Sequence, residues 1–302
     1  MSEQEYFEEN GYVVVPSLFN TSKIDRVLEV FDETIQPSRL SFYRQSSARW
    51  EKNKLNSSGY VTQSFLDPHD LEPFPDWSNS IRQLFNASDL LSCLTRLTGQ
   101  SEFNIVQTMF FDANTATPAH RDDYYLDSIP NGNLFAVWIA AEDIHQEAGR
   151  FYVVPRSHRM GLELTKSEML SNALYQNKIQ KLIDSGNLTI VAPELKKGDA
   201  LFWRSDLIHG ALPTTNASLS RKSLTAHFLP KKFQFGSRYR TDVRKIDYFD
   251  VQGFSFARVP SDRRSFSVKS LMVSEAMKLL DHLPLIKSAL MSIKGQQVGR
   301  TF

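Results

Sequence analysis

The spacing of apolar residues changes near residue 100, and the two parts of the chain predict different structures. Residues 21–36 and Ser88 to Thr98 carry apolar side chains at helical spacing, and Gly99 follows the second segment as a stop signal. The short apolar run from Gly11 to Pro16 predicts a buried strand. Residues 39–77 show no sustained period, so we expect long loops there, which in a compact domain are often functional.

After residue 100 the chain consists of short runs rich in Val, Ile, Phe, Tyr and Trp, separated by Gly, Pro, Asn and Asp. Such runs predict strands. The expected strands are Phe103 to Asp112, Leu134 to Glu142, Phe151 to Val154, Leu188 to Val191, Ala200 to Trp203, Ile208 to Leu212 and Ser223 to Leu229. One helical insertion at residues 165–185 interrupts them. We therefore expect a mainly β fold with flanking helices, a jelly-roll of the cupin-like, double-stranded β-helix kind.

The sequence has no internal repeat or low-complexity linker, so we expect one domain over residues 1–302. Within it, residues 1–100 would form a helical buttress with lid loops, and residues 101–230 the jelly-roll core. Residues 231–302 would form a basic extension ending in a helix at Val273 to Met291. Between residues 231 and 269 this extension has ten Lys/Arg against four Asp, which suits a solvated surface or a face for an anionic partner.

Composition and charge narrow the possible partners. The formal net charge of +1 gives no overall field for nucleic acid, so we expect no nucleic-acid partner. The only cysteine, Cys93, cannot form an internal disulfide, and the acidic N-terminus does not resemble a secretion signal; both features favour a cytoplasmic protein. No apolar stretch reaches the roughly 20 residues that cross a bilayer, so we expect no membrane span.

Two of the seven histidines and one aspartate suggest a metal site. In an extended segment, His120 and Asp122 would project from the same face, and His209 lies beside Gly210 at the start of a predicted strand. Two histidines and one carboxylate can occupy one face of an octahedral iron(II) and leave the other positions open for oxygen chemistry. A hydrogen-bonded surface pair at His120-Asp122 and a core histidine at 209 are the simpler alternatives.

A buried cation is expected twelve residues after His209. Arg221 opens the strand-like run Arg221 to Leu229. If its guanidinium faces inward, it needs a carboxylate, which it can pair in a bidentate manner. A dicarboxylic co-substrate could provide this group.

Several segments together resemble the phytanoyl-CoA dioxygenase family of iron(II)- and 2-oxoglutarate-dependent oxygenases. The resemblance extends in order from about residue 5 to residue 230. It is carried by Phe7 to Pro16, Thr117 to Asp122, Ala136 to Ala141, Gly149 to His158, Lys197 to Gly210 and Arg221 to Phe228. It implies a double-stranded β-helix that binds iron(II), 2-oxoglutarate and O2.

By this resemblance, His120, Asp122 and His209 match the iron ligands, and Arg221 matches the arginine that binds the distal carboxylate of 2-oxoglutarate. Three further positions, Gln107, Met109 and Trp138, match or adjoin the lining of the co-substrate pocket, with ordinary core packing as the alternative.

One position departs from the family pattern. Ala211 stands where relatives often carry Ser or Thr, so a hydroxyl that would help to hold the carboxylate is missing. We expect that Arg221 acts either with less support or together with Ser223.

The implied reaction converts 2-oxoglutarate to succinate and CO2 and oxidises an unactivated C–H bond, most simply by hydroxylation. Desaturation, ring formation and dealkylation remain open. A halogenase is disfavoured because Asp122 fills the coordination position that chloride would need.

Polar residues near the predicted metal site and in the loops favour a small polar or zwitterionic metabolite as substrate. We expect a monomer or homodimer. The candidate substrate residues are Arg44, Arg49, Trp50, Tyr124, Tyr125 and Arg204. An acyl-CoA hydroxylase is the alternative, because the basic extension could neutralise phosphates. A zinc hydrolase is disfavoured because it would have no use for Arg221. A nucleic-acid demethylase is favoured only by the basic extension. A non-catalytic jelly-roll that binds a metabolite is a further alternative.

Overall fold

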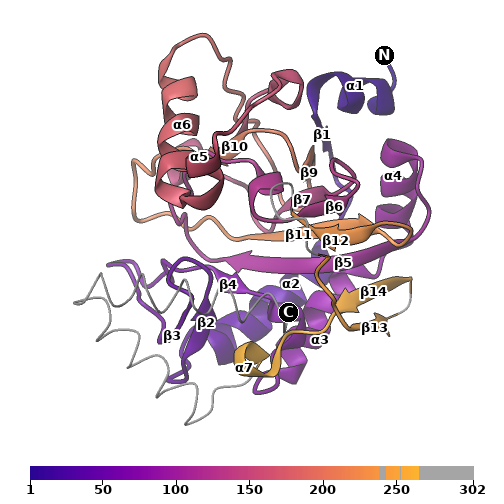
Figure 1. Cartoon of the computed structure of the whole chain (residues 1–302). Coiled ribbons are helices and arrows are strands. Elements are labelled where there is room, and N and C mark those ends of the chain that lie inside the picture. Colours follow the sequence, from indigo (N-terminus) through magenta and orange to yellow (C-terminus); the bar gives the residue numbers. More distant parts are fainter. Residues whose placement is uncertain (238–242, 252, 265–302) are drawn as a thin grey trace.

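A large sheet forms the centre of the molecule in the computed structural model, which describes residues 1–237, 243–251 and 253–264 (Figure 1). Its strand order is β1-β9-β7-β11-β5-β14-β13, and β4 pairs with β5 outside this path. The strands are β1 (Tyr12–Val15), β4 (Phe65–Leu66), β5 (Phe103–Phe111), β7 (Phe135–Ala140), β9 (Ala200–Arg204), β11 (Ser223–Pro230), β13 (Tyr248–Val251) and β14 (Phe254–Ala257).

Small sheets complete the β structure. The pair β8 (Phe151–Val153) and β10 (His209–Ala211) is extended by isolated bridges, His120 to His209 and Val153 to Val191. Two other antiparallel pairs are β2 (Phe42–Arg44) with β3 (Arg49–Glu51), and β6 (Asp127–Ile129) with β12 (Gln234–Gly236). The β8-β10 pair and its bridges bring His120 and His209 together.

The strands of the large sheet separate core residues from site residues by simple alternation. On β11, Leu224, Ala226 and Phe228 belong to the main hydrophobic core. The intervening Thr225 and His227 line a cavity on the opposite face. Because successive side chains of a strand point to opposite faces, one strand can serve both purposes.

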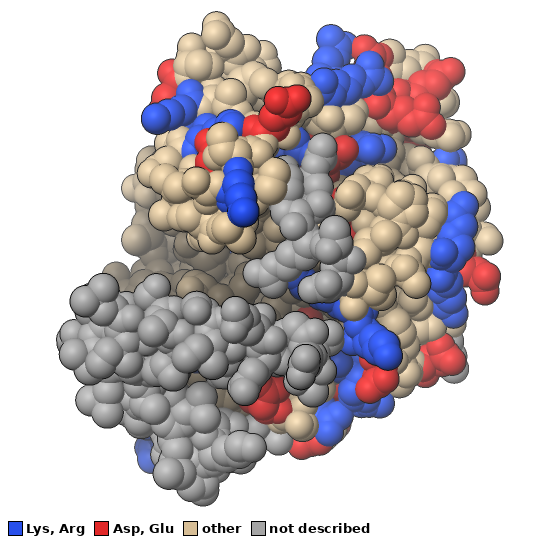
Figure 2. All heavy atoms as spheres, in the orientation of Figure 1, with Lys and Arg blue, Asp and Glu red and all other residues tan. Residues whose placement is uncertain are grey.

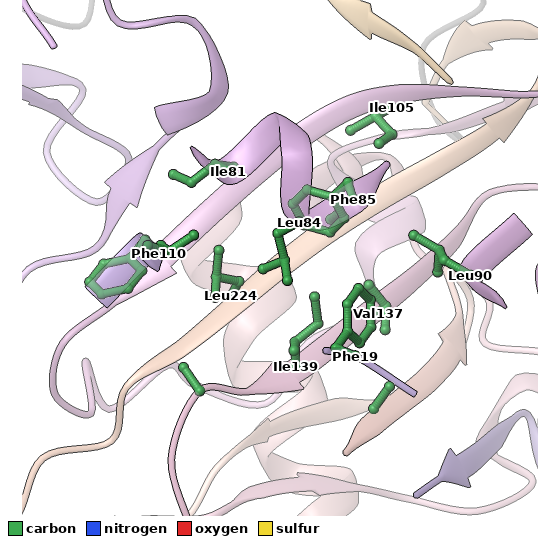
Figure 3. Packing of buried hydrophobic residues seen from close by; sticks show 14 of the residues in the cluster. Phe19, Ile81, Leu84, Phe85, Leu90, Ile105, Phe110, Val137, Ile139 and Leu224 are labelled. Carbon is green, nitrogen blue, oxygen red and sulfur yellow. The ribbon is translucent and has the colours of Figure 1, made fainter. Parts of the chain in front are cut away.

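Helices cover the core face of the sheet. Figure 3 shows Ile81, Leu84 and Phe85 packed against side chains of the sheet. The helices of this region are α1 (Glu3–Asn10), α2 (Thr21–Val30), its π-helical continuation η1 (Phe31–Ile35), α3 (Pro75–Phe85) and α4 (Ser88–Thr98). Short helical turns elsewhere are η2 (Pro68–Asp70), η3 (Asp122–Tyr124), η4 (Gln146–Ala148), η5 (Ser157–Arg159) and α7 (Ser261–Arg264).

The insertion between β8 and β9 forms two helices, α5 (Lys166–Leu170) and α6 (Asn172–Asp184), and lies at one end of the sheet (Figure 1). The single predicted helix is therefore divided. Ser171 causes the division, because its extended backbone ends α5 and its side chain caps α6 by accepting from the Leu174 N–H.

Other predicted elements also differ from the structure. The predicted strand at Leu188 to Val191 contributes only the bridge at Val191. The predicted loops contain β2, β3 and β4, and they end in α3. The sequence does carry a signal for α3, since Pro75 is the first helical residue and the buried apolar side chains follow it at helical spacing.

The region predicted as a basic extension joins the main sheet, because β14 pairs in parallel with β5. The predicted helix at Val273 to Met291 lies outside the described residues. Within the described part of the chain, no helix has the length and apolarity to cross a membrane. Acidic and basic side chains lie interspersed on the face shown in Figure 2.

Candidate active site

Two histidines and one aspartate converge at one end of the β8-β10 pair. One ligand atom each from His120, Asp122 and His209 lie within 4.8 Å of one another. His120 and His209 face each other across an antiparallel bridge, with reciprocal backbone hydrogen bonds of 2.9 Å. The backbone pairing therefore fixes the positions of both imidazole rings.

Hydrogen bonds also fix which nitrogen of each ring can bind a metal. The Nδ1 atom of His120 lies 2.9 Å from the Pro118 carbonyl oxygen, and Nδ1 of His209 lies 2.9 Å from that of Leu207. A carbonyl can only accept, so each Nδ1 donates its proton. The Nε2 lone pairs then face Asp122, as metal-binding histidines require.

The Asp122 carboxylate presents its two oxygens to different neighbours. Oδ1 lies 3.5 Å from the Nε2 atom of each cluster histidine. Oδ2 accepts from the Trp203 indole N–H at 2.8 Å and lies 3.3 Å from Nε2 of His227. Burial alone would raise the pKa of Asp122, but the surrounding histidines hold it well below its usual range. The carboxylate is therefore ionised and oriented.

Arg221 brings a buried positive charge to the same region. Its side chain is 2% exposed, and one nitrogen donates to the Gly149 carbonyl at 3.2 Å. Among the described residues, its Nε has no hydrogen-bond partner and no carboxylate forms an ion pair with it. Burial lowers the pKa of Arg221 to about 10, so the guanidinium stays charged near neutral pH. A buried, unpaired guanidinium fits a carboxylate ligand.

The metal cluster and Arg221 share one cavity of about 500 Å³. Its inner part, the cavity floor, consists of His120, Asp122, His209 and Arg221. Its outer part, the cavity mouth, consists of Gln45, Ser46, Thr62, Gln63, Tyr125, Asn172 and Gln176. The mouth thus comes from the predicted lid loops, the η3 region and the insertion helix α6.

The predicted pocket residues lie as follows. Gln107, Met109 and Trp138 line the cavity. Ser223 does not, since its hydroxyl donates to the Arg221 carbonyl at 3.3 Å. Thr225, two positions further along β11 on the same face, brings a hydroxyl to the cavity instead.

Of the candidate substrate residues, only Tyr125 lines the cavity. Arg44 is buried beneath the loops, and the Trp50 indole donates to the Asp262 carbonyl at 3.0 Å. Arg49 belongs to β3 and lies outside the cavity wall.

Tyr124 and Arg204 also make contacts elsewhere. The Tyr124 ring stacks on Tyr175 at 3.8 Å, and Arg204 pairs with Asp206. In the same loops, Gln45 and Gln63 line the cavity instead, and which residues contact the substrate stays a prediction.

Sequence reasoning missed Trp203 and His227 as partners of Asp122. Each side chain lies on the inner face of its strand, in alternation with core residues, so the signal was the strand period. The mouth residues of α6 had no such signal, because their role depends on where the insertion docks.

A jelly-roll with a His-Asp-His cluster on its inner face is the architecture of the non-haem iron oxygenases. Phytanoyl-CoA dioxygenase (PhyH) is the family whose sequence model matches residues 7–223, and the chain belongs to this family. It is therefore a non-haem iron, 2-oxoglutarate-dependent enzyme. The predicted family is confirmed.

Relatives and solved structures agree with this assignment. The peroxisomal phytanoyl-CoA dioxygenase of Bos taurus is 22% identical over 297 residues, covering 91% of this chain and 79% of the relative. The human protein of the same name is 23% identical over 239 residues, covering 76% and 68%.

Among solved structures, the epimerase SnoN in complex with Fe3+, alpha ketoglutarate and nogalamycin RO has a TM-score of 0.59 at 15% identity, covering 84% of this chain and 96% of SnoN. EctD from S. alaskensis with 2-oxoglutarate and 5-hydroxyectoine has a TM-score of 0.56 at 15% identity, covering 81% and 82%. These similarities confirm the predicted jelly-roll fold.

Proposed function

We propose that this protein hydroxylates an unactivated C–H bond of a small polar molecule. His120, Asp122 and His209 would hold the iron, and Arg221 would bind the distal carboxylate of 2-oxoglutarate. When bound, iron and 2-oxoglutarate supply the oxidation, in which one oxygen atom of O2 enters succinate, CO2 is released and the other oxygen atom becomes the hydroxyl of the product.

The protein's own residues orient the reactants. The two Nε2 lone pairs and Asp122 Oδ1 converge on one point beside the cavity. Trp203 and His227 hold the other carboxylate oxygen, which favours binding through Oδ1 alone. Three ligands from one side leave the cavity side open to reactants.

The unpaired guanidinium of Arg221 is the observation that carries this proposal. A buried cation without a counter-charge is costly unless a ligand supplies one. A zinc hydrolase or a simple metabolite-binding jelly-roll gives no reason to keep such a charge beside a metal cluster. A dicarboxylate bound across the cavity floor would bind both the Arg221 guanidinium and the metal.

The fold does not select the substrate, since SnoN and EctD bind very different ligands, nogalamycin RO and 5-hydroxyectoine. Acyl-CoA hydroxylation is the second candidate, favoured by the name of the mammalian relatives. Of the described basic residues that could bind the phosphates of such a substrate, two already form ion pairs with carboxylates of the protein: Arg258 with Asp70, and Arg264 with Glu72. Arg238 and Arg240 lie outside the described residues.

Anaerobic titration tests the proposed site without any substrate. Adding 2-oxoglutarate to the iron(II)-loaded protein should produce the weak visible charge-transfer band of a bidentate 2-oxoglutarate complex. In Arg221→Ala this band should require a much higher 2-oxoglutarate concentration. A wild-type protein that binds iron(II) but never develops the band would contradict the proposed reaction.

A further inference from the structure

Three polar side chains form a hydrogen-bonded group on the insertion side of the cavity mouth. The Tyr125 hydroxyl donates to Asn172 Oδ1 at 2.7 Å, and Gln176 Nε2 donates to the Tyr125 oxygen at 3.0 Å. The Asn172 NH2 and the Gln176 carbonyl have no hydrogen-bond partner among the described residues. Rotating both amides reverses their roles but still leaves one donor and one acceptor.

The helix that carries these amides is fixed relative to the metal cluster. Asn172 and Gln176 lie one turn apart on α6, so both face the cavity. Between them, Tyr175 is buried, and its hydroxyl accepts from the Arg121 N–H at 2.7 Å. Arg121 stands between two of the cluster residues. The donor and acceptor are therefore held at a set position relative to the iron site.

The remaining cavity wall lacks charge. Apart from the cavity floor and His227, every described residue of the wall is uncharged. Many carry amides or hydroxyls: Gln45, Ser46, Thr62, Gln63, Ser64, Gln107, Thr115, Thr117, Tyr125, Asn172, Gln176 and Thr225. With Arg221 occupied by 2-oxoglutarate, the described wall offers a charged substrate no counter-ion, whereas it offers hydrogen bonds to a neutral one.

We propose that the substrate is an uncharged molecule rich in hydroxyl or carbonyl groups, and that Asn172 and Gln176 recognise it by donating and accepting one hydrogen bond each. This inference rests on the proposed function. It replaces the broader expectation of a polar or zwitterionic metabolite. It also makes α6 the element that sets specificity, because a wall built to pair polar groups discriminates against compounds that leave them unpaired.

A substrate panel tests the class. The iron(II)-loaded protein with 2-oxoglutarate would be given neutral glycosides and polyols, zwitterionic amino-acid derivatives, and acyl-CoA thioesters, with succinate and oxidised product measured together. At least one neutral compound should give coupled turnover above every charged compound. Coupled turnover with charged compounds alone, or with no compound in the panel, would overturn the inference.

The anaerobic charge-transfer band distinguishes failure of the proposed substrate class from failure of the proposed function. If the band forms but neutral compounds do not react, the proposed oxygenase reaction survives and only the substrate class is lost. If the band does not form, the proposed function fails and this inference fails with it.

A matched pair of variants tests the recognition residues. Gln176→Leu should raise KM for the best neutral compound roughly three- to tenfold, the range expected for one lost hydrogen bond, while KM for 2-oxoglutarate stays unchanged. Gln180→Leu makes the same replacement one turn later on α6, where the side chain bonds Asp184 outside the cavity, and should change neither constant. Equal effects of the two substitutions would show a structural role for the helix and refute recognition by Gln176.

Discussion

The cavity floor and the cavity mouth are built by opposite means. The floor consists of ionisable groups that backbone pairing and strand register hold in place. The mouth consists of uncharged amides and hydroxyls on loops and on the insertion helix. The difference indicates two separate roles: the strands position the groups that carry out the oxidation, and the loops and the insertion helix determine substrate specificity.

Removing a floor ligand should have the largest effect. Asp122→Ala deletes one of three protein ligands, so we expect substrate oxidation to fall by more than about 100-fold. Circular dichroism should show a retained fold, because the strands that carry the histidines do not depend on this side chain. Wild-type turnover in a well-folded Asp122→Ala protein would show that the iron is held elsewhere.

Removing the floor cation should affect the co-substrate selectively. Arg221→Ala leaves a buried carboxylate without its partner, typically at a cost of about 2–5 kcal/mol, so KM for 2-oxoglutarate should rise about 30-fold or more. The affinity for iron(II), measured by chelator competition, should stay near the wild-type value. An unchanged 2-oxoglutarate dependence would assign the carboxylate to another cation.

Much of the floor could be predicted from the sequence because its residues lie in short, ordered segments. His120 and Asp122 are two positions apart, His209 begins β10, and Arg221 precedes the start of β11 by two residues, so local spacing nearly determines their direction. The mouth could be predicted only as a region. The loops were expected to reach the site, and they do. In the segment 44–46, however, the charged Arg44 is buried away from the cavity, whereas the uncharged Gln45 and Ser46 line it.

The same limit applies to the fold. Strands with clear alternation, such as β5 and β11, were predicted almost to the residue. In contrast, β13 and β14 were missed, because their role in the sheet depends on a parallel pairing with β5 far away in the sequence. Long-range pairing of this kind leaves no local pattern.

Removing the indole N–H of Trp203 should lower the affinity for iron(II) moderately. Trp203→Phe keeps an aromatic ring but frees Asp122 Oδ2 on one side, so iron(II) affinity should fall about tenfold, the lower end for loss of a ligand's partner. Trp138→Phe is the control, because Trp138 lines the same cavity without contacting Asp122 through its indole nitrogen. If both variants lost iron(II) equally, aromatic packing would explain the effect and the hydrogen bond would not.

Substitution of Arg44, which lies beneath the mouth loops, should have the smallest effect, and that effect should be on the free energy of unfolding. Its guanidinium lies 4.3 Å from the Phe65 ring centre and donates to the Ser64 carbonyl at 3.1 Å and to Asn53 Oδ1 at 2.6 Å. Arg44 is 1% exposed, so its charge is poorly solvated, and this burial lowers its pKa to about 10.

Two substitutions at Arg44 separate packing from charge. Arg44→Met loses the hydrogen bonds, each worth about 0.5–1.5 kcal/mol, but it also removes the cost of burying a cation and keeps most of the volume. We therefore expect its free energy of unfolding to fall by less than about 1.5 kcal/mol, whereas Arg44→Ala, which opens a void beside Phe65, should cost more than about 2 kcal/mol. Chemical denaturation measures both values. If methionine proved as costly as alanine, the hydrogen bonds to Ser64 and Asn53 would be what holds the mouth loops, and Arg44 would control the shape of the cavity through them.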